Sequence, residues 1–142
     1  MSHRVFVYGT LKEGFPNFRV NRGARLAGEF VTVEAHPLYM LGRCPVPWLL
    51  ELPGEGHPVR GQVFEVDDAA LAAMDELEMV SVPGWYVRRR IRVRPAEPAR
   101  GAPIEAFVYF GCASRLAEVP VHGGPIAEYT LADAAGYRDG EL

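Results

Sequence analysis

Short segments rich in β-branched and aromatic residues, each bounded by glycine or proline, run through most of this chain. Such segments are typical of β-strands, and the frequent prolines restrict them to short strands or to the edges of a sheet. The pattern predicts strands over residues 5–8, 25–33, 38–41, 48–52, 60–66, 86–94 and 104–111. A chain with this pattern is constrained to a fold dominated by β-sheet.

The clearest helix is predicted over residues 68–78, which are built largely from strong helix formers, with Asp67 as the N-cap. Several strands with one main helix predict an α+β domain with a mostly antiparallel, barrel-like sheet. The length of 142 residues fits a single domain over residues 1–142. Residues 95–103 are expected to form a surface loop. Residues 127–142 combine helix-forming alanines with Gly136, so their structure stays open.

Glu78 ends the predicted helix on its apolar side. With about 100° of rotation per residue, Glu78 falls between Met74 and Leu71, whereas Asp75 and Glu76 point toward the opposite, solvated side. A carboxyl group among apolar neighbours loses hydration, which favours taking up and returning a proton near neutrality. Glu78 is therefore a candidate general acid/base, and the alternative is a carboxylate that simply turns out to water.

A glycine-bounded loop from Gly9 to Gly14 follows the first predicted strand. It is not a phosphate-binding P-loop, because Phe15 and Pro16 stand where that motif needs Lys and Ser or Thr. Its successive backbone N–H groups could still hold an anion, such as a carboxylate or a developing oxyanion. The alternative is an ordinary turn.

The charge of the chain argues against nucleic acid and membranes as partners. The formal net charge is −3, which gives no overall attraction to either polyanion. The alternating arginines near position 90 predict one solvated strand face formed by Arg88, Arg90, Arg92 and Arg94, whereas Arg89 lies on the other face and needs a carboxylate partner.

Cys44 and Cys112 lie far apart in the sequence and form no C-x-x-C pair, so we expect reduced, structural cysteines rather than a disulfide or a zinc site. No export signal and no apolar stretch of about 20 residues is visible, which predicts a cytoplasmic protein. No metal-ligand cluster or cofactor motif is found, and no signal indicates the oligomeric state.

Residues 5–14, Val-Phe-Val-Tyr-Gly-Thr-Leu-Lys-Glu-Gly, resemble the sequence that opens γ-glutamylcyclotransferases, and Pro16-Asn17 continue the resemblance. Further similar segments follow in the family's order over roughly residues 4–110: Pro47-Trp48-Leu49-Leu50, Gly61-Gln62-Val63-Phe64, Met74-Asp75-Glu76-Leu77-Glu78, Tyr86-x-Arg88 and Phe107-Val108-Tyr109. Within the family, the opening and the Pro-Trp-Leu-Leu segment are most similar to the γ-glutamylamine cyclotransferase branch.

The resemblance implies a small α+β domain with a β-barrel core, and an enzyme that closes a γ-glutamyl group into 5-oxoproline and releases an amine. It implies Glu78 as the catalytic residue and Tyr8, Gly9, Thr10 and Leu11 as substrate-binding residues, without metal or cofactor. Two alternatives stay open: a cyclotransferase for another γ-glutamyl compound, such as a γ-glutamyl amino acid, and a non-catalytic binding module on the same fold.

Overall fold

Strand β1 (Ser2–Val7) is paired on both of its edges. In the computed structural model, which describes residues 1–138 and 142, β1 pairs antiparallel with β6 (Arg60–Asp67) and parallel with β8 (Ile104–Gly111). The chain therefore leaves β1 at Val7 between two neighbouring strands. The loop that follows is fixed at its origin by both of them.

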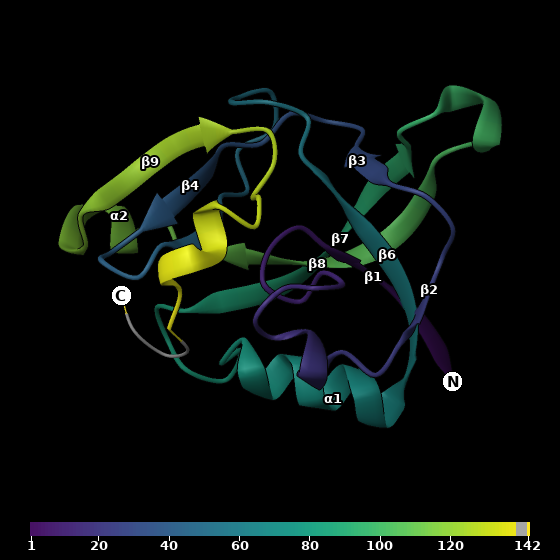
Figure 1. Ribbon diagram of the computed structural model, residues 1–142, viewed down its shortest axis with the longest axis horizontal. Helices are drawn as coiled ribbons and strands as arrows, with labels where there is room; N and C mark the ends of the chain where they lie inside the picture. Colours follow the sequence, from purple (N-terminus) through teal and green to yellow (C-terminus); the bar gives the residue numbers. More distant parts are fainter. Residues whose placement is uncertain (139–141) are drawn as a thin grey trace.

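The remaining pairings close the sheet into a ring. Strand β8 pairs antiparallel with β7 (Tyr86–Pro95), β7 with β3 (Phe30–Thr32), and β3 with β6, as Figure 1 shows. The short strand β2 (Ala24–Arg25) also pairs with β6. The predicted α+β domain with a mostly antiparallel, barrel-like sheet is confirmed. The single strand predicted over residues 25–33 is wrong, because Gly28 adopts φ of 83° and separates β2 from β3.

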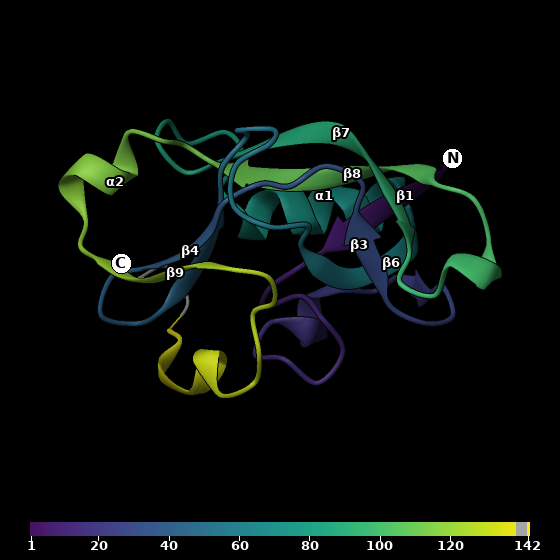
Figure 2. The same cartoon turned by 90° about the horizontal axis from the view of Figure 1, so that it is seen from above.

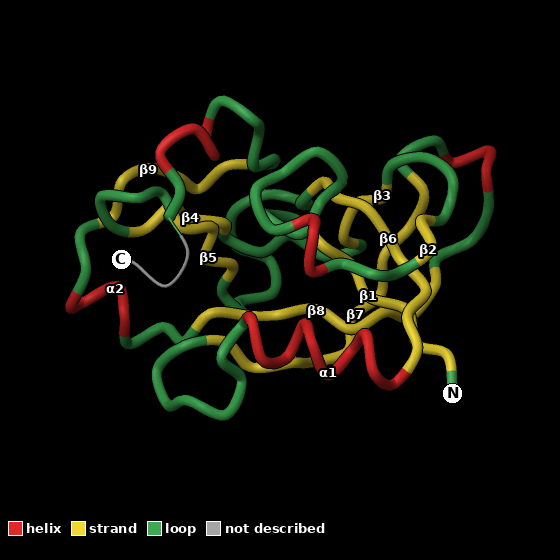
Figure 3. The backbone as a smooth tube through the Cα atoms, turned by 60° about the horizontal axis from the view of Figure 1, so that its bottom comes forward, coloured by secondary structure: helices red, strands yellow, loops and turns green. Residues whose placement is uncertain are grey.

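Helix α1 (Asp68–Leu77) packs across one side of the ring, beside β7 and β8 (Figures 1 and 3). The predicted N-cap is confirmed, since the Asp67 carboxylate accepts a hydrogen bond of 2.7 Å from the backbone N–H of Ala70. Glu78 is the C-cap residue of this helix. The helix therefore delivers Glu78 to the end of the molecule at which β1 also ends.

Both faces of β1 are buried over Val5–Val7, which explains the continuous apolar run there. Val5 and Val7 pack in one cluster with α1, and Phe6 and Tyr8 pack in a second cluster with side chains of β3, β6, β7 and β8. Because side chains alternate along a strand, the backbone after Tyr8 emerges between the helix-covered face and the interior of the ring.

A second sheet lies at one end of the ring, and Figure 2 shows it away from the loop that joins β7 and β8. It has the order β5 (Val46–Leu49), β4 (Leu38–Leu41), β9 (Val121–Ile126). Strand β4 has its predicted bounds, β5 begins two residues before the predicted segment 48–52, and β9 was not predicted. Prolines occur in the edge strands β5 and β9, as the sequence predicts for edges.

The remaining described helices are short: η1 (Phe18–Val20), η2 (Pro98–Arg100), α2 (Arg115–Glu118) and η3 (Asp133–Gly136). The predicted loop over residues 95–103 contains η2, and the open segment 127–142 contains η3; residues 139–141 lie outside the described residues. In the described part of the chain, no helix is long and apolar enough to cross a membrane.

Candidate active site

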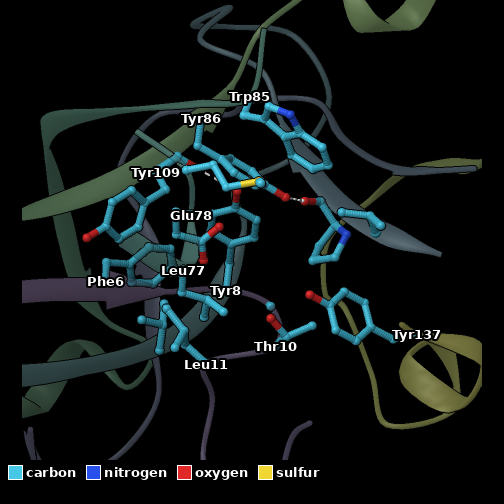
Figure 4. A pocket seen from close by; sticks show the side chains of 15 residues that line it. Phe6, Tyr8, Thr10, Leu11, Leu77, Glu78, Trp85, Tyr86, Tyr109 and Tyr137 are labelled. Atoms are coloured by element: carbon cyan, nitrogen blue, oxygen red, sulfur yellow. Dashed lines mark hydrogen bonds between the residues drawn. The ribbon is translucent and has the colours of Figure 1, made fainter. Parts of the chain in front are cut away.

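One cavity is lined by all five residues that the sequence and its family resemblance predict for the site. Glu78 enters from the end of α1, and Tyr8, Gly9, Thr10 and Leu11 enter from the chain that follows β1. The cavity has about 590 Å³ of empty space when its open mouth is included. Figure 4 shows Glu78 directed toward the space between Tyr8 and Thr10.

The rest of the wall is mainly apolar and aromatic. It is formed by Phe6, Val7, Val46, Pro47, Leu77, Met79, Trp85, Tyr86, Tyr109 and Tyr137. Among the described lining residues, Glu78 is the only Asp, Glu, Lys, Arg or His. The cavity therefore offers one carboxylate inside an otherwise uncharged wall.

The loop after β1 is held by hydrogen bonds to its carbonyl groups. The Gly9 carbonyl accepts from the Lys12 N–H at 3.1 Å, and the Thr10 carbonyl accepts from the Asn17 N–H at 2.9 Å. In a planar trans peptide the C=O and the following N–H point in opposite directions. The N–H groups of Thr10 and Leu11 therefore point away from these loop contacts, and neither donates to a backbone carbonyl in the described chain. Such a pair of N–H groups can hold an anion.

Glycine is required at position 9 because Pro47 packs directly against the backbone there. A Cβ atom on Gly9 would lie 2.6 Å from Cγ of Pro47. Two buried asparagines hold the rest of the loop: Asn17 donates to Oγ1 of Thr10 at 2.9 Å, and Asn21 donates to the Leu11 carbonyl at 3.0 Å. The loop is thus supported from both sides, which keeps its N–H groups in place.

Three tyrosines surround Glu78 as rigid walls. Burial raises the pKa of Tyr8, Tyr86 and Tyr109, and the negative charge of Glu78 adds to each of these increases. Their hydroxyl groups donate elsewhere: Tyr8 to the Tyr109 carbonyl at 2.6 Å, Tyr86 to the Pro47 carbonyl at 2.5 Å, and Tyr109 to Asp75 at 2.7 Å. The tyrosines therefore stay protonated, and none of these three hydroxyl protons is directed to Glu78.

Asp75 corrects the helical-wheel prediction. Glu76 is exposed, as expected, but Asp75 accepts hydrogen bonds from Arg88 at 2.5 Å and from Tyr109 at 2.7 Å, and its side chain is only 29% exposed. The prediction failed because strands β7 and β8 cover that side of the helix. Asp75 thereby fixes the last turn of α1, which carries Glu78, to two strands of the ring.

The predicted solvated arginine face of β7 is exposed at Arg90 and Arg92 and partly buried at Arg88 and Arg94. The guanidinium groups of Arg88 and Arg90 lie over the ring of Phe107, 4.6 and 5.0 Å from its centre. Arg89 has the expected carboxylate partner, Glu51, at 3.8 Å, but both side chains are about half exposed rather than buried. Arg88 therefore links the sheet to the helix through Asp75, and Arg90 packs on the surface of the sheet.

Met79 follows Glu78 in a left-handed backbone conformation, with φ of 54°, and it is the only non-glycine residue with positive φ in the described chain. Its N–H donates to the Glu76 carbonyl and the Val80 N–H to the Asp75 carbonyl, both at 3.1 Å. This is the Schellman motif, in which glycine usually occupies the left-handed position. A side chain is thus retained at a strained position that lines the cavity.

Several wall residues were missed as site residues by the sequence analysis. Pro47, Tyr86 and Tyr109 lie in segments that resemble the family, but no local pattern marks them as lining a cavity. Met79 and Tyr137 carried no sequence signal. The two cysteines form no disulfide and are half-buried rather than fully buried. No group of three or more His, Cys, Asp or Glu in the described residues is placed to hold a metal ion.

A half-buried carboxylate that shares a cavity with a loop whose N–H groups donate to no backbone carbonyl suits proton transfer beside a developing anion, which is the chemistry of an acid/base enzyme. Comparison with known proteins defines the family. The family model described as "Gamma-glutamyl cyclotransferase, AIG2-like" matches residues 5–128, and the chain belongs to this family.

Individual relatives agree with this assignment. The "Gamma-glutamylaminecyclotransferase" of Rattus norvegicus is 42% identical over 118 residues, covering 77% of this chain and 77% of the rat protein. The protein of the same name from Bos taurus is 47% identical over 110 residues, covering 74% of this chain and 63% of the bovine protein. The crystal structure of an AIG2-like protein from Mus musculus superposes with a TM-score of 0.77 at 34% identity, covering 99% of this chain and 97% of the mouse chain.

The contacts of Asp75 predict that substitutions of the neighbouring residues Asp75 and Glu76 differ in their effect on the stability of the protein. Asp75→Ala should lower the free energy of unfolding by about 1–3 kcal/mol, because Arg88 and Tyr109 lose their acceptor. Glu76→Ala should change it by less than about 0.5 kcal/mol, because Glu76 is exposed. Urea denaturation of both variants measures the difference. Equal effects would contradict a structural role for Asp75.

The left-handed backbone at Met79 predicts that two truncations differ in stability. Met79→Ala and Met79→Gly both remove the side chain, but only glycine adopts positive φ without a steric cost. The glycine variant should therefore be more stable than the alanine variant by about 1 kcal/mol. Urea denaturation again provides the comparison, and an alanine variant as stable as the glycine variant would show that residue 79 is not strained.

Proposed function

We propose that this protein is a γ-glutamylamine cyclotransferase, which cyclises the γ-glutamyl group of its substrate to 5-oxoproline and releases the free amine. The observation that carries the proposal is the cavity that Glu78 shares with Thr10 and Leu11, whose backbone N–H groups donate to no backbone carbonyl in the described chain. The names of the rat and bovine relatives support the same activity.

The reaction needs a group that removes and returns a proton. In the proposed mechanism, the Glu78 carboxylate takes a proton from the α-ammonium group of the substrate, and the resulting amine attacks the γ-carbonyl carbon of the same molecule. Glu78 then gives this proton to the nitrogen of the leaving amine as its bond to the γ-carbon breaks. The regenerated carboxylate takes the second proton from the ring nitrogen, which leaves the neutral lactam N–H, and passes that proton to the released amine. One carboxylate suffices, because both nitrogens are bonded to the same carbon in the tetrahedral intermediate.

The loop after β1 supports the anionic part of the substrate. The N–H groups of Thr10 and Leu11 would donate to an oxygen of the substrate carboxylate or of the developing oxyanion. The aromatic wall would hold the glutamyl chain folded, and a folded chain favours ring closure because the reaction is intramolecular. This division of roles requires no enzyme nucleophile.

The composition of the cavity favours an amine over an amino acid as the leaving group. A γ-glutamyl amino acid carries a second carboxylate next to the amide nitrogen, and burying that charge without a partner is costly. No Lys or Arg lines the cavity in the described chain. A γ-glutamylamine such as ε-(γ-glutamyl)-lysine has methylene groups at that point, which fit an apolar aromatic wall.

Glu78→Gln tests the proposed role most simply. The amide keeps the size of the side chain but cannot accept the proton, so the rate of 5-oxoproline release should fall by about 10²–10⁴-fold or more. Purified protein is assayed with ε-(γ-glutamyl)-lysine, and circular dichroism checks that each variant is folded.

Glu76→Gln is the matched control, because Glu76 is exposed and belongs to the same helix. Its rate should stay within about twofold of the unmodified protein, as for most surface changes away from a site. A folded Glu78→Gln variant that retains full activity would show that another group transfers the proton.

A further inference from the structure

Part of the cavity wall comes from a segment that the family model does not match. The match ends at residue 128, whereas Tyr137 lies beyond it and lines the same cavity as Glu78. Figure 4 shows Glu78 and Tyr137 on opposite sides of the cavity, with Thr10 between them. This chain therefore completes its pocket with a residue of its own C-terminal segment.

Buried contacts fix the start of this segment. Tyr129 is fully buried; its carbonyl accepts a hydrogen bond of 2.5 Å from Nζ of Lys12, and its hydroxyl donates to the Pro45 carbonyl at 2.7 Å. The Asp133 carboxylate, at the start of the short helix η3, accepts from the Thr130 N–H at 2.8 Å. The chain that leads to Tyr137 is thus tied both to the loop after β1 and to the chain next to β5.

The hydroxyl group of Tyr137 is tied directly to the substrate-binding loop. The side-chain amide of Asn17 donates to the Tyr137 hydroxyl at 2.9 Å and to Oγ1 of Thr10 at 2.9 Å. Asn17 is only 1% exposed, so the amide has little freedom to turn. Its side-chain amide therefore links the Tyr137 hydroxyl to Thr10.

The side of the cavity on which Tyr137 lies indicates which part of a substrate it meets. If the glutamyl group lies between Glu78 and the N–H groups of Thr10 and Leu11, the bond to the leaving amine extends away from this end. The opposite wall carries Tyr137, and Trp85 also lines the cavity. Aromatic walls stabilise aliphatic chains by removing apolar surface from water.

We propose that Tyr137 is a specificity-determining residue, whose ring contacts the carbon chain of the leaving amine. The inference rests on the proposed cyclotransferase function and extends it to the choice of substrate. It predicts that the enzyme prefers γ-glutamyl conjugates of long-chain amines to those of short ones, and that the preference depends on the ring of Tyr137.

The test compares kcat/KM for γ-glutamyl-n-butylamine and γ-glutamyl-methylamine, together with the Kd of 5-oxoproline. Tyr137→Ala should lower kcat/KM for the butylamine conjugate by about tenfold, the usual scale for a lost contact in a hydrophobic pocket. The methylamine conjugate and 5-oxoproline lack the chain, so their values should change by less than about twofold.

Two further variants complete the comparison. Tyr137→Phe keeps the ring and should keep the preference for the butylamine conjugate, whether or not the alanine variant folds. Leu131→Ala is the control in the same segment, because Leu131 is 60% exposed and does not line the cavity. It should leave both substrates unaffected.

Each other outcome overturns a defined part of the account. An unmodified protein that cyclises neither conjugate overturns the proposed function, and the inference with it. If the unmodified protein is active, loss of the preference in Tyr137→Phe, or an unchanged preference in folded Tyr137→Ala, overturns the inference alone. An equal loss in Tyr137→Ala for both substrates and for 5-oxoproline would show that Tyr137 has only a structural role.

Discussion

Strand β1 pairs with β6 on one edge and with β8 on the other, and the position of the candidate site depends on this double pairing. The pairing closes the ring, and both faces of the strand are buried over Val5–Val7. It also determines where the chain leaves the sheet, at Tyr8. The loop that supplies the N–H groups of Thr10 and Leu11 therefore starts from a rigid point, and buried asparagines hold its far side.

Helix α1 brings the second half of the site to the same place at a cost in stability. A carboxylate at the C-terminal end of a helix meets the negative end of the helix dipole, and Glu78 is also half-buried. The next residue, Met79, is strained. Asp75 offsets part of this cost by fixing the last turn to Arg88 and Tyr109. Such a concentration of unfavourable local interactions and backbone strain is typical of functional sites rather than of structural helix ends.

The sequence allowed the main elements to be predicted where local patterns are strong. Helix α1 has a capping residue and strong helix formers, and β4 is a short apolar run that ends at glycine. Strand β9 was missed because two glycines and a proline interrupt it and its pattern has no period of two. Residues 25–33 contain two strands because Gly28 turns the chain.

The part of the site that could be predicted is also the part with a strong local pattern in the sequence. Glu78 and the loop after β1 could be named from local pattern and from the family resemblance. The roles of Asp75, Met79 and Tyr137 could not be predicted in this way. The partners of Asp75 come from strands distant in sequence, and the backbone at Met79 depends on how the helix ends. Tyr137 lies in a segment that hydrogen bonds from Lys12 and Asn17 join to the distant loop after β1.

The most direct measurement of the central claim is a crystal structure of the protein with 5-oxoproline bound. We expect the lactam N–H to donate to the Glu78 carboxylate, because this nitrogen is the one from which Glu78 would take the proton. An oxygen of the product should accept from the N–H groups of Thr10 and Leu11. A ring bound in this cavity with its N–H directed away from Glu78, or bound at another place, would contradict the account.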